Sequence, residues 1–125
     1  MTNETGDSLR GVSAVIVEDN LLVADSIQLV LESFDCEVTG VVGTVEKAHD
    51  LIQNGEYDIA ILDIDLRGRS VVPVVADVKA RDKAFLFLSG YGDEAVLPDE
   101  LQSIPRLRKP IDPGVLVDTI KKLVA

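Results

Sequence analysis

The residues of this chain whose types could do chemistry together are two adjacent acids, a third carboxylate, a hydroxyl and an ammonium: Glu18, Asp19, Asp63, Ser89 and Lys109. Clustered carboxylates repel one another unless a cation neutralises them, and a site made of oxygen ligands selects a hard ion such as Mg²⁺. A carboxylate beside such an ion can accept a phosphoryl group, whose oxygens the ammonium and the hydroxyl would contact. If one crevice gathers these groups, they predict phosphoryl transfer with Asp63 as the nucleophile.

Each of these groups follows an apolar run that is typical of a β-strand. The run at 59–62 places four apolar residues directly before Asp63, which favours a strand buried on both faces. The five expected strands cover residues 12–17, 36–42, 59–62, 84–88 and 104–107. A carboxylate in the core is costly, so one at the end of such a strand indicates a use at the edge of the sheet.

Helical patterns separate the expected strands. They cover residues 21–34, 44–54, 71–81, 93–102 and 113 onward. Ser70 is expected to cap the third helix, and the fourth pattern is the weakest because Pro98 interrupts it. Strands that alternate with helices predict an α/β fold, in which helices cover both faces of a parallel sheet. Because ligands bind where the carboxyl ends of such strands meet, the five reactive groups should converge there.

Composition limits the possible functions. A chain of 125 residues is expected to form one domain, at residues 11–125, after a flexible tail at 1–10. The net charge of −10 argues against direct binding to nucleic acid or to an anionic membrane. Cys36 is the only cysteine, so no intrachain disulfide can form. With no signal peptide and no apolar run of membrane length, we expect a cytoplasmic protein.

The strand-end motifs resemble those of the receiver domain of two-component response regulators, over the whole stretch from Gly11 to the C-terminus. They are Glu18-Asp19 after the first strand, Asp63 after the third, Ser89 after the fourth and Lys109-Pro110 after the fifth. The resemblance implies a flavodoxin-like (βα)5 fold with strand order 2-1-3-4-5. It also implies that a histidine kinase transfers a phosphoryl group to Asp63 in a Mg²⁺-dependent reaction and that water later removes it.

The resemblance further implies a role for each site residue. Asp19, Asp63 and the backbone carbonyl of Asp65 would ligate Mg²⁺, and Glu18 would act through water. Lys109 and Ser89 would contact the phosphoryl group. The Lys109-Pro110 peptide is expected to be cis, as it often is in receivers.

A finer similarity is to the receiver subgroup named for its Phe-Ala-Thr-Gly-Tyr (FATGUY) motif. It rests on residues 85–92, 97–98 and 105–110. Members are commonly stand-alone receivers of alphaproteobacteria and are often linked to histidine kinases of the HWE type. The present chain has Leu88 and Ser89 where Ala and Thr are usual, and Ser keeps the hydroxyl.

Two positions depart from typical receivers. Arg106 occupies the place of the aromatic switch residue in the fifth strand, so the usual coupling of a Ser or Thr to that ring is in doubt. Tyr91, two residues after Ser89, is a candidate to replace it. The side chain of Asp65 is expected near the path of water to the acyl phosphate, where it could tune the lifetime of that group.

Alternatives to a phosphoacceptor receiver stay open at this point. The Asp63-Ile64-Asp65 spacing also resembles the first motif of haloacid-dehalogenase-type phosphatases, although their nucleophile normally lies on the first strand. A pseudo-receiver that is never phosphorylated would usually lack one of the strand-end residues. His49 has no second histidine or cysteine at ligand spacing, so a structural role is expected rather than a zinc site. We expect no turnover enzyme, but a regulator that acts through protein contacts or as a phosphate sink.

Overall fold

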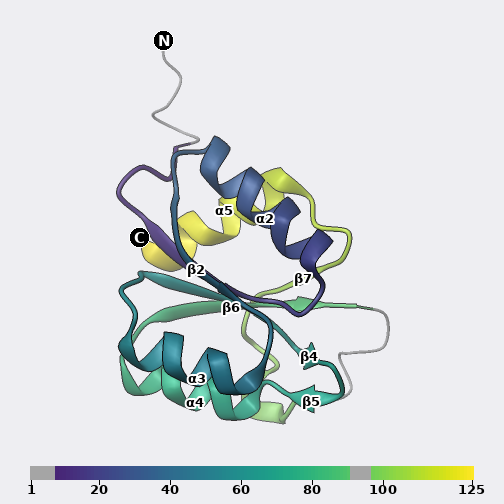
Figure 1. Ribbon diagram of the computed structural model, residues 1–125. Coiled ribbons are helices and arrows are strands. Elements are labelled where there is room, and N and C mark those ends of the chain that lie inside the picture. The colour runs from purple at the N-terminus through teal and green to yellow at the C-terminus, as the bar shows by residue number, and fades with distance from the viewer. Residues whose placement is uncertain (1–7, 91–96) are drawn as a thin grey trace.

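The computed structural model describes residues 8–90 and 97–125, and its centre is a five-stranded parallel sheet (Figure 1). The strands are β1 (Ser13–Val17), β2 (Glu37–Val42), β3 (Ile59–Asp63), β6 (Ala84–Ser89) and β7 (Arg106–Arg108). Their order across the sheet is β2-β1-β3-β6-β7. The predicted α/β fold and the predicted order of its five long strands are therefore confirmed.

Strand β3 lies at the centre of the sheet because its first four residues, Ile59 to Leu62, are apolar and suited to burial on both faces. Ile61 pairs in parallel register with Ile16 of β1 on one side and with Leu86 of β6 on the other. Every residue of β3 is buried, including the carboxylate of Asp63 at its end. The apolar run thus delivers one charged side chain to the carboxyl edge of the sheet.

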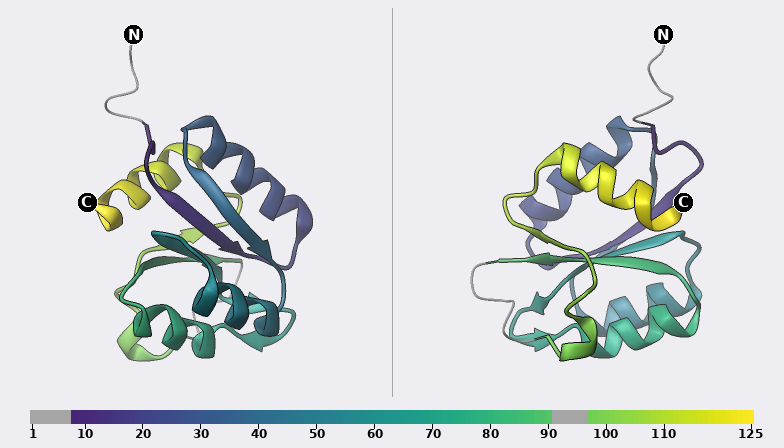
Figure 2. Two further views of the ribbon diagram at one scale, coloured as in Figure 1. Left: turned by 60° about the vertical axis from the view of Figure 1, so that its left-hand side comes forward. Right: turned by 180° about the vertical axis from the view of Figure 1, so that it is seen from behind.

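In the described part of the chain, two helices cover each face of the sheet (Figures 1 and 2). Helices α2 (Leu21–Ser33) and α5 (Pro113–Val124) lie on one face, and α3 (Val45–Asn54) and α4 (Val72–Ala80) lie on the other. The strand residues alternate between the two resulting cores: Ile16 packs with the α2 and α5 side, and Val17 with the α3 and α4 side. This two-sided burial fixes the sheet register and hence the strand ends.

Helix α2 begins directly after the acidic pair that follows β1. The Asn20 side chain caps it, since Oδ1 accepts hydrogen bonds from the N–H groups of Leu22 and Val23 at 3.0 and 3.3 Å. The Glu18 N–H donates to the Val42 carbonyl at 2.9 Å. Glu18 and Asp19 are therefore held between a strand end and a helix cap.

A short hairpin follows β3 and was not predicted. Strands β4 (Asp65–Leu66) and β5 (Arg69–Ser70) pair antiparallel around Arg67 and Gly68. Both turn residues have positive φ, 55° and 82°, as in the type I′ turns that close two-residue hairpins. Helix α4 consequently begins at Val72, and Ser70 belongs to β5, although its Oγ still accepts from the Val72 N–H at 3.1 Å.

Two further expectations need correction. Of the helix expected at 93–102, residues 93–96 lie outside the described residues, and the rest forms only a 3₁₀ turn, η2 (Asp99–Leu101). The expected tail at 1–10 included Leu9, which is instead buried in the core, with its N–H donating to the Phe34 carbonyl. Burial of the Leu9 side chain anchors this part of the chain.

The remaining local expectations concern His49, Pro110 and membrane spans. His49 on α3 contacts the carboxylate of Asp77 on α4, which also accepts a hydrogen bond from Gln53 Nε2 at 3.1 Å. His49 therefore bridges two helices as a structural residue.

The Lys109–Pro110 peptide is cis, as expected. Within residues 8–90 and 97–125, no helix is both long and apolar enough to cross a membrane.

Candidate functional site

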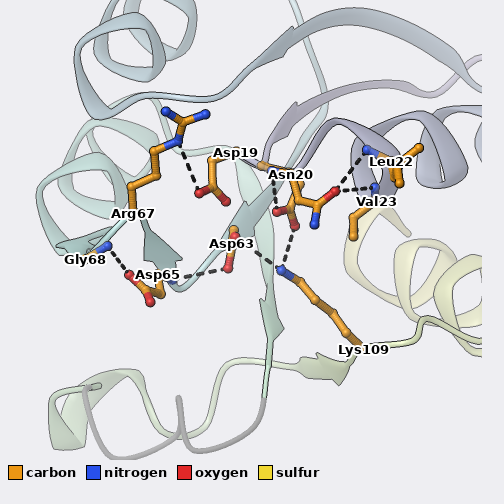
Figure 3. A network of polar contacts seen from close by, with 10 residues as sticks. Asp19, Asn20, Leu22, Val23, Asp63, Asp65, Arg67, Gly68 and Lys109 are labelled. Carbon is orange, nitrogen blue, oxygen red and sulfur yellow. Dashed lines mark hydrogen bonds and ion pairs between the residues drawn. The ribbon is translucent and has the colours of Figure 1, made fainter.

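The carboxyl ends of four neighbouring strands bring the predicted site residues together, and Figure 3 shows Asp19, Asp63 and Lys109 among them. Glu18 follows β1, Asp63 ends β3, Ser89 ends β6 and Lys109 follows β7. Residues that are 91 positions apart in the chain, Glu18 and Lys109, are in direct contact. The convergence follows from the parallel topology, as the alternation of strands and helices indicated.

Three carboxylates form the acidic side of this site. One oxygen each from Glu18, Asp19 and Asp63 can be chosen so that all three lie within 4.8 Å of one another. Glu18 and Asp63 are 1% and 2% exposed, while Asp19 is partly exposed. Three negative charges this close, two of them out of water, need a cation, and their oxygen-only donor set fits Mg²⁺.

The ammonium of Lys109 is shared between two of these acids. Its Nζ lies 2.9 Å from Glu18 Oε1 and 3.2 Å from Asp63 Oδ2. Burial alone would lower the pKa of Lys109, but the two carboxylates outweigh it and the net shift raises that pKa. Lys109 is therefore a permanent cation at physiological pH and offsets one of the three negative charges.

Asp63 is the most perturbed acid of the site. Burial raises the pKa of its carboxyl from 3.8 to about 7, and the hydrogen bond and charge of Glu18 add to the rise. Lys109 and the Asp65 N–H, which donates to Asp63 Oδ1 at 3.2 Å, act in the opposite direction. The environment therefore resists a full negative charge on Asp63 unless a further cation is supplied.

Ser89 brings a hydroxyl to the same edge. Its side chain is 1% exposed, and within the described residues its Oγ has no hydrogen-bond partner. The Ser89 carbonyl accepts from the Lys109 N–H at 2.9 Å, which fixes the backbone of both residues. A buried hydroxyl with unused bonding capacity is costly in the folded state, and it is suited to a ligand that arrives later.

The hairpin after β3 closes another side of the site. The Asp65 carboxylate accepts from the Gly68 N–H at 2.7 Å, so the side chain braces the hairpin turn (Figure 3). Arg67, at the hairpin tip, places Nε 3.5 Å from Asp19 Oδ2. Sequence reasoning missed Arg67; the signal for it is a cation four residues after Asp63, next to a glycine that can turn the chain.

Gly43 lets the end of β2 approach the acidic pair closely. A Cβ at this position would lie 3.3 Å from the Cα of Asp19 and 3.4 Å from the carbonyl oxygen of Glu18. These are backbone atoms of the two residues that carry the carboxylates, so a larger residue at position 43 would displace Glu18 and Asp19.

The switch candidates divide into described and undescribed residues. Arg106 lies in β7, where Nη1 donates to Gln102 Oε1 at 3.3 Å, near the η2 turn. Ser89 lies inside the site, as stated above. Tyr91 lies outside the described residues, so its role stays a prediction.

Comparison with known proteins agrees with this geometry. The family model of the response regulator receiver domain matches residues 14–121, which include all the strand-end residues above. The chain belongs to the response regulator receiver domain family. The family is a signalling module of two-component systems, and its acidic cluster is consistent with Mg²⁺ binding. Membership supports the receiver interpretation over the phosphatase alternative.

Individual relatives refine this placement. The chain is 27% identical over 115 residues to the sensory transduction protein LytT of Bacillus anthracis, covering 89% of this chain and 46% of LytT. The chain therefore spans about half the length of the curated relatives that it matches. The solution structure of SdrG from Sphingomonas melonis Fr1 is similar with a TM-score of 0.81 at 32% identity, covering 91% of this chain and 97% of SdrG.

A second solved structure supports the fold. The receiver domain of the Erythrobacter litoralis PhyR response regulator has a TM-score of 0.80 at 19% identity, with coverage of 93% of this receiver domain and 92% of the other. Identity at that level supports the shared architecture, and the site assignments rest on the geometry described above.

Proposed function

We propose that this receiver domain accepts a phosphoryl group on Asp63 from the phosphohistidine of a histidine kinase. The observation that carries the proposal is the buried Asp63 carboxylate at the end of β3, held 3.2 Å from Lys109 Nζ and beside the carboxylates of Glu18 and Asp19. A nucleophile, a cation for the incoming oxygens and a metal-ligand set thus share one edge of the sheet.

In the proposed transfer, an Asp63 oxygen attacks phosphorus. The new P–O bond forms as the P–N bond breaks, and the imidazole nitrogen keeps the electron pair and later takes up a proton. Lys109 neutralises one phosphoryl oxygen, and the Ser89 hydroxyl, which has no partner among the described residues, donates a hydrogen bond to another. Attack by water on phosphorus later restores the carboxylate and releases phosphate.

We propose that Asp19, Asp63 and the backbone carbonyl of Asp65 hold Mg²⁺ directly and that Glu18 acts through water. When bound, the ion supplies charge neutralisation for the carboxylates and for the incoming phosphoryl oxygens. The donor chemistry fits, since three acids lie within 4.8 Å and only Lys109 and the exposed Arg67 offset them among the described residues.

The finer assignments are also proposals. We place the chain in the Phe-Ala-Thr-Gly-Tyr subgroup on its residues 85–92, 97–98 and 105–110, and we expect an HWE-type kinase as the donor. We propose cytoplasmic action without catalytic turnover of a substrate, through contacts with another protein or by draining kinase phosphate. Ser89 and Tyr91 are the proposed switch residues, and Arg106 marks a different coupling from the usual aromatic one.

The first experiment is phosphorylation by acetyl phosphate with Mg²⁺, read by intact mass. The wild type should gain one phosphoryl group, and both Asp63→Asn and removal of Mg²⁺ by EDTA should abolish the gain. Asp25→Asn, which removes one charge from an exposed position on α2, should be phosphorylated like the wild type. Failure with acetyl phosphate and with histidine kinases would favour a pseudo-receiver, and turnover of a phosphomonoester would favour a phosphatase.

A second experiment tests the kinase class. Purified phosphorylated kinases of the HWE type and of an unrelated histidine kinase type are mixed with the receiver in turn. Faster transfer from the HWE-type kinase is expected, whereas equal or slower transfer would count against the subgroup assignment.

A further inference from the structure

Arg67 is the residue of the site for which no role has been assigned. It occupies the tip of the β4–β5 hairpin in a left-handed conformation, with φ of 55°. The buried Leu66 and the 2.7 Å hydrogen bond from the Gly68 N–H to Asp65 Oδ1 anchor this hairpin. Figure 3 shows the Arg67 side chain directed at Asp19. The fold therefore holds a cation over the open side of the acidic cluster.

The contact between Arg67 and Asp19 is suited to exchange. Nε lies 3.5 Å from Asp19 Oδ2, and the Arg67 side chain is 74% exposed. Exposed pairs of this kind change an equilibrium constant by a factor of up to about five. Arg67 and Asp19 also line a cavity of about 310 Å³ with Thr44 and Lys47, so the guanidinium has room to leave.

The charges of the site depend on where this cation sits. When Glu18, Asp19 and Asp63 are all ionised they carry three negative charges, which Lys109 and Arg67 reduce to one. Mg²⁺ on Asp19 would compete with Arg67 for the same oxygens. A phosphoryl group on Asp63 then brings a charge of about −2 in place of the carboxylate's single charge, and the site needs a further cation.

Arg67 is placed to supply that cation. The Asp19 oxygen in the cluster lies within 4.8 Å of an Asp63 oxygen, so a guanidinium that reaches Asp19 starts close to any group bound on Asp63. Its planar donor fork matches phosphoryl oxygens better than the point charge of a lysine does. Arg69 on the same hairpin contacts Glu46 instead, outside the acidic cluster.

We propose that Arg67 is an exchangeable cation. It pairs with Asp19 in the metal-free site and moves to the phosphoryl group once Mg²⁺ holds Asp19. This inference rests on the proposed function. It predicts effects of opposite sign: Arg67 opposes Mg²⁺ binding to the free protein but favours retention of the phosphoryl group.

The test measures two affinities in the full chain at low salt. Isothermal titration calorimetry gives the dissociation constant of Mg²⁺ alone. Binding of beryllofluoride, a phosphoryl mimic, is then measured at saturating Mg²⁺ by ¹⁹F NMR. The variants are Arg67→Gln, Arg67→Lys and the matched control Arg69→Gln, which removes the same charge from the same hairpin.

For Arg67→Gln we expect Mg²⁺ to bind about two- to fivefold more tightly and beryllofluoride about two- to fivefold more weakly. Arg67→Lys should keep the wild-type Mg²⁺ affinity and lose part of the beryllofluoride affinity. Arg69→Gln should change either affinity by less than about 1.5-fold, because the Arg69 guanidinium pairs with Glu46, which is not part of the acidic cluster.

Two results would overturn the inference while the proposed function stands. In one, Arg67→Gln leaves both affinities unchanged or shifts them in the same direction. In the other, Arg69→Gln reproduces the Arg67→Gln pattern, which would make net charge the cause. If wild type binds no Mg²⁺ at all, the proposed function itself fails and the inference falls with it.

Discussion

Replacing Asp63 by Asn should make the metal-free protein more stable at pH 8. The change removes one charge from a buried cluster and keeps the shape of the side chain, which is 2% exposed. Asn can still accept from the Asp65 N–H, as Asp63 Oδ1 does at 3.2 Å. The contact with Lys109 Nζ is lost, because the amide nitrogen is a donor as well.

The magnitude follows from the pKa of Asp63, which burial and Glu18 raise from 3.8 to about 7. Between these two values the folded protein binds more protons than the unfolded chain, so stability falls as the pH rises through that window. The full shift corresponds to a ceiling of ~4 kcal/mol at pH 8. Because Asn places a donor near Lys109, we expect a gain of roughly half that, about 2 kcal/mol.

The assay is urea unfolding in EDTA at pH 8 and at pH 4, followed by circular dichroism. Asp63→Asn should unfold at higher urea than the wild type at pH 8, with the difference much smaller at pH 4, where the wild-type carboxyl is protonated. Asp25→Asn is the control and should lie within about 0.5 kcal/mol of the wild type at both pH values. A variant no more stable than the wild type at pH 8 would refute the argument that this cluster is electrostatically strained.

Two further substitutions and one alkylation reaction test other features of the structure. Lys109→Met leaves the two buried carboxylates of Glu18 and Asp63 without their cation. It should lower the free energy of unfolding, measured with urea at pH 8, by about 2 kcal/mol. An unchanged free energy of unfolding would contradict the pairing of Lys109 with these acids. Ser89→Ala removes a buried hydroxyl without a described partner, so stability should change by less than about 1 kcal/mol while beryllofluoride binding weakens; a large loss of stability would point to a structural hydroxyl. Burial raises the pKa of the Cys36 thiol to about 11. At pH 8 this thiol should therefore react with iodoacetamide at least about a hundredfold more slowly in the folded protein than in urea, as measured by intact mass. Comparable rates in the two states would mean that the thiol is accessible.

Much of the fold, and the convergence of the site residues, could be predicted because both depend on the order of apolar runs and helical patterns along the chain. The apolar run before Asp63 identified the central strand, and the alternation of strands with helices implied parallel order. Once strands are parallel, residues at their carboxyl ends must share an edge. The predicted convergence of the strand-end groups includes Lys109 and Asp63, which lie 3.2 Å apart.

The hairpin after β3 could not be predicted for a physical reason. Its sequence has no alternating apolar pattern, and its turn uses Arg67 rather than the Asn or Asp that usually accompanies glycine in a type I′ turn. Leu66 alone signals burial there. The role of Arg67 depends on that turn, so it became visible only with the side chains placed.

In the described part of the helix expected at 93–102, residues 97–102, the prediction was wrong for a different reason. Its short apolar pattern suggested a helix, but Pro98 limits the backbone, and the described part contains only the turn at Asp99–Leu101. Leu97 and Leu101 are buried all the same, so burial was predicted correctly at these two positions while the conformation between them was not.

The arginines of β7 have a consequence for the solubility of the domain. β7 has three residues and lies at one edge of the sheet, with a neighbouring strand on one side only. Arg106 and Arg108 flank the buried Leu107, so the edge carries charged side chains. A short, charged edge strand disfavours pairing with strands of other molecules. Arg106 and Arg108 thus guard this edge of the sheet against aggregation.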